Sequence, residues 1–424
     1  MFLTEREKKK MNLYSNRRQK ILKALQNNAA ILLFSGKAPM RSEDEAYSFS
    51  VNRNFYYLTG LQKEDMVLML LDMDGSSREI LFIQPYDELL AKWVGGRMSK
   101  EEATEISEIE DVRDLAELDA TVASVYNRSR KDNTFKFFFD FWHYDMDQPK
   151  TAAENYAAKL RERYPSAILK DIYPVMTHLR LIKDEYEISC LKKAIHTTNL
   201  GIQQMMRSSR PGLNEMAMEG VFNFVLMQSL CRQTAFKTIA ASGERATILH
   251  YSDNDQVMKD GDLFLCDLGA TFNNYCADIS RTFPVNGRFT QRQREIYEIV
   301  LKAQKIVIDN ARVGVKIRDL NQMVIDFYRT ELPLHGLNKD VSEYYFHSVS
   351  HHLGLDTHDV DGGLGAVLEA GMVITDEPGL YIADEGIGIR IEDDLLITGT
   401  GAEVLSEEII KDPDEIEKYM EGQQ

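Results

Sequence analysis

The sequence has few cysteines and no long hydrophobic runs. Its 424 residues include four cysteines, and no two of them form a Cys-x-x-Cys pair. A disulfide framework and a structural zinc knuckle are therefore not expected. The longest apolar runs, residues 29–34 and 66–71, span about six residues, whereas a membrane-spanning helix needs about twenty. Residues 1–20 lack the apolar segment of a secretory signal, so we expect a cytoplasmic protein without a membrane anchor.

Positive charge is also scarce relative to negative charge. Lys and Arg total 50 against 67 Asp and Glu, which gives a formal net charge of −17. Such a surface repels phosphate backbones and anionic lipids, so nucleic acids and membranes are not expected partners. The 44% hydrophobic content is that of a folded chain, and the length predicts two or three domains.

Several common catalytic signatures are missing. The sequence contains no Gly-x-Ser-x-Gly elbow, no P-loop and no His-Glu-x-x-His motif. The cluster Gly362-Gly363-Leu364-Gly365 lacks the spacing of a dinucleotide-binding loop, and a surface turn is the expected structure. These absences disfavour serine hydrolases, kinases, zincins and Rossmann dehydrogenases.

Apolar periodicity predicts a mixed α/β chain. In the first part, short apolar runs predict strands at residues 30–34, 66–72, 79–83 and 137–141. In the second part, Asp184 and Glu187 have capping-box spacing at a helix start, and Asn214 can cap a helix that runs to residue 228. We also expect helices at 290–312 and 317–330, and strands at 262–270, 275–283, 372–377 and 388–398. The change of pattern predicts domains at 1–175 and 176–424, with a peripheral tail after Asp412.

Histidines are concentrated in one segment. Of nine in the chain, four fall within residues 347–358, where chance predicts about a quarter of one (9 × 12/424). The four are His347, His351, His352 and His358, and a fifth, His250, stands in the run Ile248-Leu249-His250-Tyr251. One histidine alone would indicate a structural residue, but this cluster indicates a functional site.

Carboxylates interrupt two predicted hairpins. Asp267 lies in an apolar strand, where an unpartnered carboxylate is costly. A turn at 271–274 would place Asp278 opposite Asp267, or one or two positions out of register, with opposed Cβ atoms about 5 Å apart. Glu377 and Glu392 are similarly symmetric about residues 384–385. Acid pairs this close do not ionise cheaply without a cation between them.

Four carboxylates and one imidazole form an oxygen-rich set of metal ligands. This set suits hard or borderline divalent ions, with Mn(II) favoured and Co(II) or Zn(II) as alternatives. Five ligands are too few for two separate coordination shells, so shared ligands between two ions are expected. Two such ions would polarise a carbonyl and lower the pKa of a shared water. The pattern predicts metal-assisted hydrolysis of an amide.

Five motifs resemble those of the pita-bread metallopeptidases, which include methionine aminopeptidase, prolidase and aminopeptidase P. They are Leu265-Cys266-Asp267-Leu268-Gly269, Ala277-Asp278-Ile279-Ser280-Arg281-Thr282-Phe283, Ser350-His351-His352-Leu353-Gly354, Glu377-Pro378-Gly379-Leu380-Tyr381 and Ile389-Arg390-Ile391-Glu392-Asp393-Asp394. The resemblance implies a C-terminal catalytic domain with two αββ halves related by a pseudo-twofold axis. Asn54-Phe55-Tyr56-Tyr57-Leu58-Thr59-Gly60 resembles the smaller N-terminal domain of aminopeptidase P and prolidase, and the histidine segment is most similar to that of Xaa-Pro aminopeptidases.

The resemblance also implies roles for individual residues. Asp267 would bind one metal ion, and Asp278 and Glu392 would bridge both ions. His351 and Glu377 would complete the coordination shell of the other ion. His250 and His358 would donate hydrogen bonds to the developing oxyanion, and Glu377 is a candidate proton shuttle. His347 and Tyr381 would line the proline pocket, with Arg390 supporting Glu392.

Some positions depart from the family pattern. Asn54 stands where an Asp is frequent, which could remove a carboxylate that orients Arg390. Asp376 is expected to face outward from its strand, although an additional acid behind the metal ligands is the alternative, and His352 is expected to be exposed. Trp93 resembles a tryptophan that such enzymes use near the cleft, sometimes across a subunit contact, but local packing explains it equally well.

The leading hypothesis is an exopeptidase that removes the N-terminal residue before proline by means of a hydroxide bridging two metal ions. Its partners would be peptides with proline at the second position, and the chain would form a homo-oligomer, either a dimer or a tetramer. Prolidase is the nearest alternative, restricted to Xaa-Pro dipeptides. A pseudoenzyme that binds a partner in the cleft and a metal-free, creatinase-like hydrolase are the others.

Overall fold

The computed structural model describes residues 12–25, 28–360 and 366–421, so the glycine cluster at 362–365 lies outside the described residues. Contacts divide the chain into two compact units, Met1–Leu179 and Arg180–Gln424. Within the described ranges, no helix has both the length and the apolar character needed to cross a bilayer.

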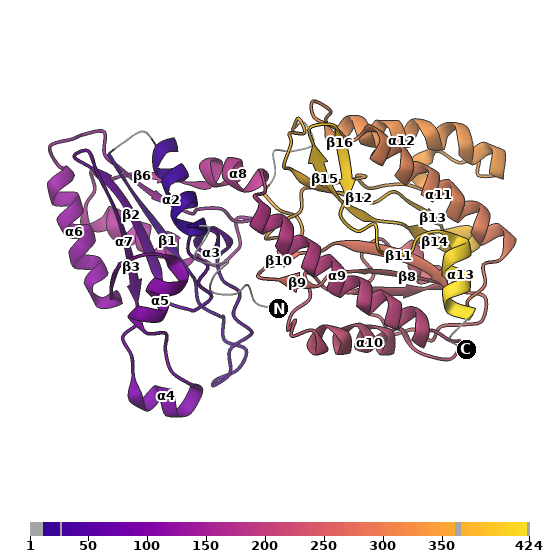
Figure 1. Ribbon diagram of the computed structural model, residues 1–424, viewed down its shortest axis with the longest axis horizontal. Helices are drawn as coiled ribbons and strands as arrows, with labels where there is room; N and C mark the ends of the chain where they lie inside the picture. The colour runs from indigo at the N-terminus through magenta and orange to yellow at the C-terminus, as the bar shows by residue number, and fades with distance from the viewer. Residues whose placement is uncertain (1–11, 26–27, 361–365, 422–424) are drawn as a thin grey trace. The chain divides into compact units, whose positions relative to one another are not determined.

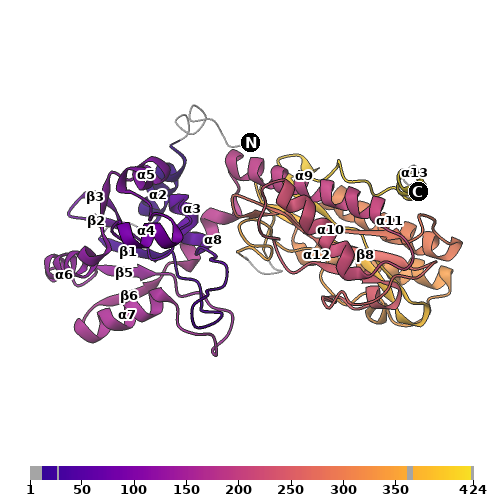
Figure 2. The same cartoon turned by 90° about the horizontal axis from the view of Figure 1, so that it is seen from below.

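The first unit is a six-stranded mixed sheet covered by helices on both faces. Its strand order is β4-β3-β2-β1-β5-β6, and all four predicted strands are confirmed. The strands are β1 (Ala29–Phe34), β2 (Val67–Met73), β3 (Ser76–Ile83), β4 (Asp111–Asp114), β5 (Lys136–Phe139) and β6 (Ile168–Asp171). Figure 2 shows α6 (Leu118–Ser129) and α7 (Ala152–Arg163) on one side of this sheet, and α2 (Leu13–Ala24) and α5 (Lys100–Ser107) on the other. Coverage of both faces explains why the central strands are continuous apolar runs.

Smaller helices complete the first unit and lead into the second. They are α3 (Arg53–Thr59), α4 (Glu88–Val94) and α8 (Tyr173–Leu181), the last of which spans the boundary between the units. Trp93 on α4 is 81% exposed, so local packing does not explain it. Asn54 on α3 donates a hydrogen bond to Asp140 at 2.9 Å, within the first unit.

The helices of the second unit begin where the capping residues predict. Asp184 and Glu187 form the expected capping box at the start of α9 (Glu185–Ser208), and Asn214 accepts from the backbone N–H of Ala217 at the start of α10 (Glu215–Gln228). The other two predicted helices are confirmed as α11 (Gln291–Asn310) and α12 (Ile317–Glu331). Figure 1 shows these helices packed along the outside of the strands of the unit.

The strands of the second unit form two similar halves. In the first half, the sheet order is β11-β8-β7, and in the second half it is β12-β15-β16. Each half has a pair of helices followed by an antiparallel hairpin, which is the predicted αββ repeat. The strands are β7 (Ile239–Ser242), β8 (Leu263–Leu268), β9 (Thr271–Phe272), β10 (Tyr275–Cys276), β11 (Ile279–Pro284), β12 (Val373–Asp376), β13 (Gly379–Ile382), β14 (Ile387–Arg390), β15 (Asp393–Thr398) and β16 (Gly401–Val404).

The first acid-bearing hairpin turns where the sequence predicts. Asn273 and Asn274 both have positive φ, as the two central residues of a tight hairpin turn require. Asp267 on β8 pairs with Ser280 on β11, so Asp278 lies two positions from the residue opposite Asp267 (280 − 278 = 2). This register is within the predicted range. The strand expected over 275–283 is interrupted between β10 and β11, at the position of Asp278.

The second hairpin brings its two glutamates directly opposite each other. The register runs from Asp376↔Asp393 to Gly379↔Arg390, which places Glu377 opposite Glu392. The predicted opposition is therefore confirmed. The strand expected over 388–398 is broken at Glu392, whose backbone N–H donates instead to the carbonyl of Ser280 at 3.0 Å. That bond joins the two hairpins at their acids.

The segment after Asp412, which we expected to be a peripheral tail, forms a helix with one buried face. Residues Pro413–Glu421 form α13, whose Pro413, Ile416 and Met420 side chains are buried. These side chains recur at three- and four-residue spacing, so a helix places them on one face. The polar residues between them account for the polar composition of the segment.

Close packing at the interruption of the first hairpin predicts the effect of a single methyl group. A Cβ atom at Gly269 would lie 1.8 Å from the carbonyl oxygen of Ala277. We expect Gly269→Ala to destabilise the second unit by about 3 kcal/mol or more, because the backbone must move. Gly220→Ala on α10 is the matched control, since its Cβ meets nothing within 4 Å and helix propensity predicts a slight gain. Thermal unfolding of the full chain measures both, and equal unfolding temperatures would contradict this account of Gly269.

Candidate active site

One cavity in the second unit collects almost all of the predicted site residues. Its volume is about 750 Å³. The predicted residues that line it are Asp267, Asp278, His351, Glu377, Glu392, His250, His358, His347 and Arg390. Tyr381 is buried and is not among the lining residues. The two hairpins supply the four predicted carboxylates. The segment between α12 and β12 supplies three of the predicted histidines, and its His352 lines the cavity as well.

Donor atoms from both hairpins converge on His351. The ligand atoms of Asp278, His351 and Glu392 lie within 4.8 Å of one another. His351 Nε2 is 3.4 Å from Asp278 Oδ2 and 3.5 Å from Glu377 Oε1. His351 Nδ1 lies 3.1 Å from the carbonyl oxygen of His352, so Nδ1 donates its hydrogen there and the Nε2 lone pair faces the carboxylates. This is the arrangement of a histidine that binds a metal ion.

The carboxylates raise one another's pKa values. Burial, followed by the nearby Asp267, raises the pKa of Asp278 well above its usual range, and burial with Asp278 does the same for Glu392. Burial also raises the pKa of Glu377, although His351 and Arg390 oppose the shift. Asp267 Oδ1 is buried and has no hydrogen-bond partner among the described residues. Divalent cations would satisfy this oxygen and remove the repulsion, so the residues present fit a metal centre.

A buried guanidinium organises one side of the cavity. Arg390 donates from Nη2 to Asp267 Oδ2 at 2.7 Å, from Nη1 to the Tyr381 hydroxyl at 2.9 Å and from Nε to Ser280 Oγ at 2.8 Å. Asp267, Ser280 and Tyr381 all belong to the second unit, so they orient Arg390 although Asn54 replaces the frequent Asp.

Tyr381 contacts His347 through its hydroxyl group. The Tyr381 hydroxyl accepts from Arg390 and lies 2.9 Å from His347 Nε2, while His347 Nδ1 lies 2.8 Å from the carbonyl oxygen of Ser348. Nδ1 must therefore carry the hydrogen, and Tyr381 donates to Nε2. Burial, with the positive charge of Arg390, lowers the pKa of His347 to about 3. His347 is thus neutral at physiological pH and held in one tautomer.

His358 stands next to His351. The His351 and His358 rings lie edge to face with centroids 4.3 Å apart. Partial burial lowers the pKa of His358, and the imidazoles of His351 and His250 lower it further. His358 is therefore a neutral N–H donor near pH 7. His250 lines the same cavity.

A buried ion-pair cluster anchors the residue after His358. Asp359 Oδ1 accepts from Arg180 Nη2 at 2.5 Å, and its Oδ2 accepts from Lys183 Nζ at 3.1 Å. All three side chains are almost fully buried. These two cations lower the pKa of Asp359 to about 2, against the effect of its burial. The cluster fixes the backbone that carries His358.

The sequence patterns do not predict two hydroxyl-bearing residues of the site, Ser280 and Thr375. Ser280 Oγ lies 2.8 Å from Glu392 Oε2. Thr375 Oγ1 accepts from the backbone N–H of His351 at 3.1 Å and donates to Glu377 Oε1 at 3.4 Å. Both stand in buried strands, where a small hydroxyl residue gives no distinct signal. The partners Glu392 of Ser280 and His351 of Thr375 come from other segments, which only the folded structure brings together.

Two expectations of exposure are wrong. Asp376 is completely buried, and neither of its carboxylate oxygens has a hydrogen-bond partner among the described residues. Burial and the opposing Asp393 raise the pKa of Asp376 well above its usual range, which favours the protonated carboxyl group. His352 is 2% exposed. Its backbone forms a bridge with Ile374 in β12, which draws this part of the histidine segment into the core.

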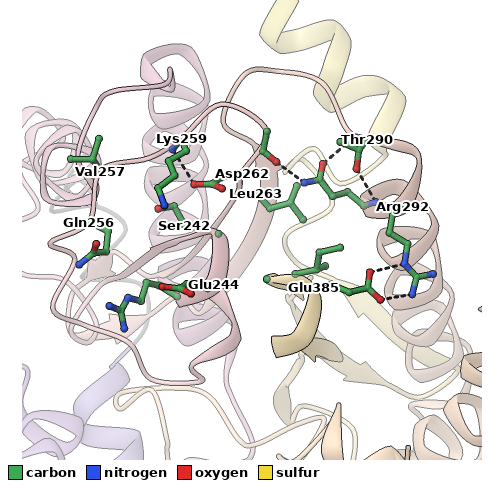
Figure 3. Close-up of a pocket in the computed structure, with 16 residues that line it drawn as sticks. Ser242, Glu244, Gln256, Val257, Lys259, Asp262, Leu263, Thr290, Arg292 and Glu385 are labelled. Atoms are coloured by element: carbon green, nitrogen blue, oxygen red, sulfur yellow. Dashed lines mark hydrogen bonds and ion pairs between the residues drawn. The ribbon is translucent and has the colours of Figure 1, made fainter. Parts of the chain in front are cut away.

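A second pocket of the same unit lacks the features of a catalytic site. It has a volume of about 480 Å³ and contains no histidine or cysteine among its lining residues (Figure 3). Arg292 forms two hydrogen bonds with Glu385 at 2.7 Å each, and Asp262 accepts from the backbone N–H of Lys259 at 2.9 Å. Arg292, Glu385 and Asp262 therefore already have partners, and the predicted acids and histidines line the larger cavity and not this one.

The raised carboxyl pKa values predict how the metal-free protein responds to pH. Between the usual carboxyl pKa of about 4 and the raised folded-state value, the folded chain holds more protons than the unfolded chain, so stability falls as pH rises. Asp278→Asn removes one such group. We expect the unfolding temperature of the chelated variant to fall less between pH 5 and pH 8 than that of the chelated wild type.

The matched control for this experiment is Asp253→Asn, because Asp253 is an exposed acid. It should follow the wild-type curve. Divalent ions should flatten that curve in the wild type but not in Asp278→Asn. Parallel curves for the wild type and Asp278→Asn would contradict the repulsion described above.

Comparison with known proteins agrees with the geometry of the site. Residues 189–399 match metallopeptidase family M24, and residues 14–135 match the N-terminal domain of aminopeptidase P. The Xaa-Pro aminopeptidase of Escherichia coli (strain K12) is 35% identical, over 96% of this chain and 97% of the relative. That of Haemophilus influenzae is 36% identical, over 96% of each.

Solved structures show the same likeness. A putative aminopeptidase P from Bacillus anthracis has a TM-score of 0.94 and 41% identity, covering 97% of this chain and 99% of that one. Zn-substituted E. coli aminopeptidase P in complex with product has a TM-score of 0.88 and 33% identity, covering 97% and 98%. The chain therefore belongs to metallopeptidase family M24, in the group whose members carry an aminopeptidase P N-terminal domain.

Proposed function

We propose that this metallopeptidase is a Xaa-Pro aminopeptidase, which hydrolyses the bond between an N-terminal residue and a following proline. The observation that carries the proposal is the convergence of four buried or partly buried carboxylates and His351 in one cavity. The N-terminal unit and the relatives named above favour Xaa-Pro peptides as substrates.

The proposed metal ligands are the five residues of that convergence. Asp267, Asp278, His351, Glu377 and Glu392 would hold two divalent ions, with Asp278 and Glu392 shared between them. Because four of the five ligands are carboxylates, we propose Mn(II), with Co(II) or Zn(II) as alternatives. Bound ions of this kind supply a Lewis acid for the scissile carbonyl and lower the pKa of water.

The remaining side chains position the substrate and its protons. His250 and His358 would donate N–H hydrogen bonds to the oxygen of the scissile carbonyl, where charge develops in the transition state. Glu377, whose pKa is raised by burial, would pass a proton to the leaving imino nitrogen. His347 would contact the proline ring, and Tyr381 and Arg390 would hold His347 in place.

We also propose a homo-oligomer, either a dimer or a tetramer, that resides in the cytoplasm. Leu89 and Trp93 on α4 are 68% and 81% exposed. They stand four residues apart and therefore share one face of the helix. An exposed apolar face of this kind is typical of a protein–protein contact.

Peptide length separates the proposed activity from that of prolidase. Protein stripped with a chelator and then supplied with Mn²⁺ should hydrolyse Xaa-Pro-Yaa tripeptides and longer Xaa-Pro peptides faster than Xaa-Pro dipeptides. Release of the N-terminal amino acid measures the rate for each peptide. A preference for dipeptides would indicate prolidase, and the absence of metal-dependent turnover would contradict the proposal as a whole.

His358 provides a test of oxyanion stabilisation. We expect His358→Ala to lower kcat by about 100- to 1,000-fold, because one preorganised donor is lost. Its metal content should remain that of the wild type, since His358 is not a proposed ligand. His196→Ala is the control, because His196 is an exposed histidine of α9 that faces Glu408. Unchanged kcat in His358→Ala would exclude this role.

A further inference from the structure

Ser280 links the metal ligand Glu392 to the buried Arg390. Its hydroxyl oxygen lies 2.8 Å from Glu392 Oε2 and 2.8 Å from Arg390 Nε. Ser280 itself is completely buried on β11, in the first half of the second unit. Arg390 and Glu392 belong to the second half. The hydroxyl therefore bridges the two halves within the site.

The donors and acceptors available determine the direction of the two hydrogen bonds of Ser280. A guanidinium can only donate, so Ser280 Oγ accepts from Arg390 Nε. The single hydroxyl hydrogen is then left for Glu392 Oε2, and a charged carboxylate accepts it strongly. Backbone bonds reinforce the same alignment, because the Glu392 N–H donates to the Ser280 carbonyl oxygen at 3.0 Å. Glu392 is thus held by both the side chain and the backbone of Ser280.

We propose that Ser280 is a positioning residue, whose hydroxyl orients the Glu392 carboxylate for metal binding and couples it to Arg390. This inference rests on the proposed function, because it takes Glu392 as a metal ligand. Groups that hydrogen-bond to metal ligands typically change metal affinity or activity by about 10- to 100-fold when they are removed. The bond from Arg390 Nε to Ser280 also fixes the guanidinium whose Nη2 pairs with Asp267. Ser280 therefore acts on ligands from both hairpins.

Thr282 offers a matched control on the same strand. It lies two residues beyond Ser280, so the two side chains share one face of β11. Thr282 is also completely buried, and its hydroxyl donates to the Arg390 carbonyl oxygen at 3.1 Å and accepts from the Arg390 N–H at 3.2 Å. Both hydroxyls thus contact Arg390, but only that of Ser280 contacts a carboxylate of the site.

The experiment compares Ser280→Ala, Ser280→Thr and Thr282→Val in the full chain. Each protein is stripped with a chelator and titrated with MnCl₂ by calorimetry, and kcat and KM are then measured at saturating Mn²⁺ with a Xaa-Pro tripeptide. We expect Ser280→Ala to bind Mn²⁺ about 10- to 100-fold more weakly. Ser280→Thr keeps the hydroxyl and should restore most of that affinity. Thr282→Val should bind Mn²⁺ as the wild type does.

Thermal unfolding of the metal-free proteins separates a specific effect on Glu392 from a general loss of stability. Ser280→Ala and Thr282→Val should lose similar stability, because each removes one buried hydroxyl. Unchanged Mn²⁺ affinity in Ser280→Ala would overturn the inference, as would equal weakening in Thr282→Val. A wild type that binds no Mn²⁺ would contradict the proposed metal centre itself. That result is distinct from the one that contradicts only the role of Ser280, in which the wild type and Ser280→Ala bind Mn²⁺ equally well.

Discussion

Electrostatic repulsion among the buried carboxylates is the constraint on which the second unit depends. Asp267, Asp278 and Glu377 each contribute to the raised pKa of Glu392. Arg390 offsets only part of this repulsion, because it is one cation among four acids and shares its donors with two hydroxyl groups. Divalent ions would remove the remainder, so metal binding and the stability of this unit are coupled. This coupling also explains why a fold would retain so many acids in its interior.

Each pair of acidic residues comes from one hairpin. In each hairpin the backbone hydrogen bonding between the two strands is interrupted at one of these acidic residues. At Asp278 and Glu392 the cross-strand backbone pairing of the hairpin lapses, and the free N–H groups find other partners. The Asp278 N–H donates to Asp394 Oδ2 at 3.3 Å, and the Glu392 N–H donates to the Ser280 carbonyl oxygen. Each interruption therefore ties one half of the unit to the other. The resulting contacts bring together carboxylates that lie more than one hundred residues apart in sequence.

The histidine segment is positioned by backbone bonds to the second hairpin. The N–H groups of Thr375 and Glu377 donate at 2.9 Å to the carbonyl oxygens of His351 and Val349. This alignment places His351 beside Glu377. Farther along the segment, Asp359 is fixed by Arg180 and Lys183, at the start of the second unit. The segment is thus attached to the rest of the unit on both sides of His358.

The sequence by itself determined the helix starts, the two hairpins and the acids and histidines that line the cavity. These features depend on local patterns, such as Asn273-Asn274 in a turn or Asp184 at a cap. Tertiary structure alone decided the burial of Asp376 and His352, the packing of α13 and the bond from Ser280 to Glu392. The physical reason is that burial and side-chain partners depend on which distant segments cover a residue, and a single sequence does not encode that coverage in any local pattern.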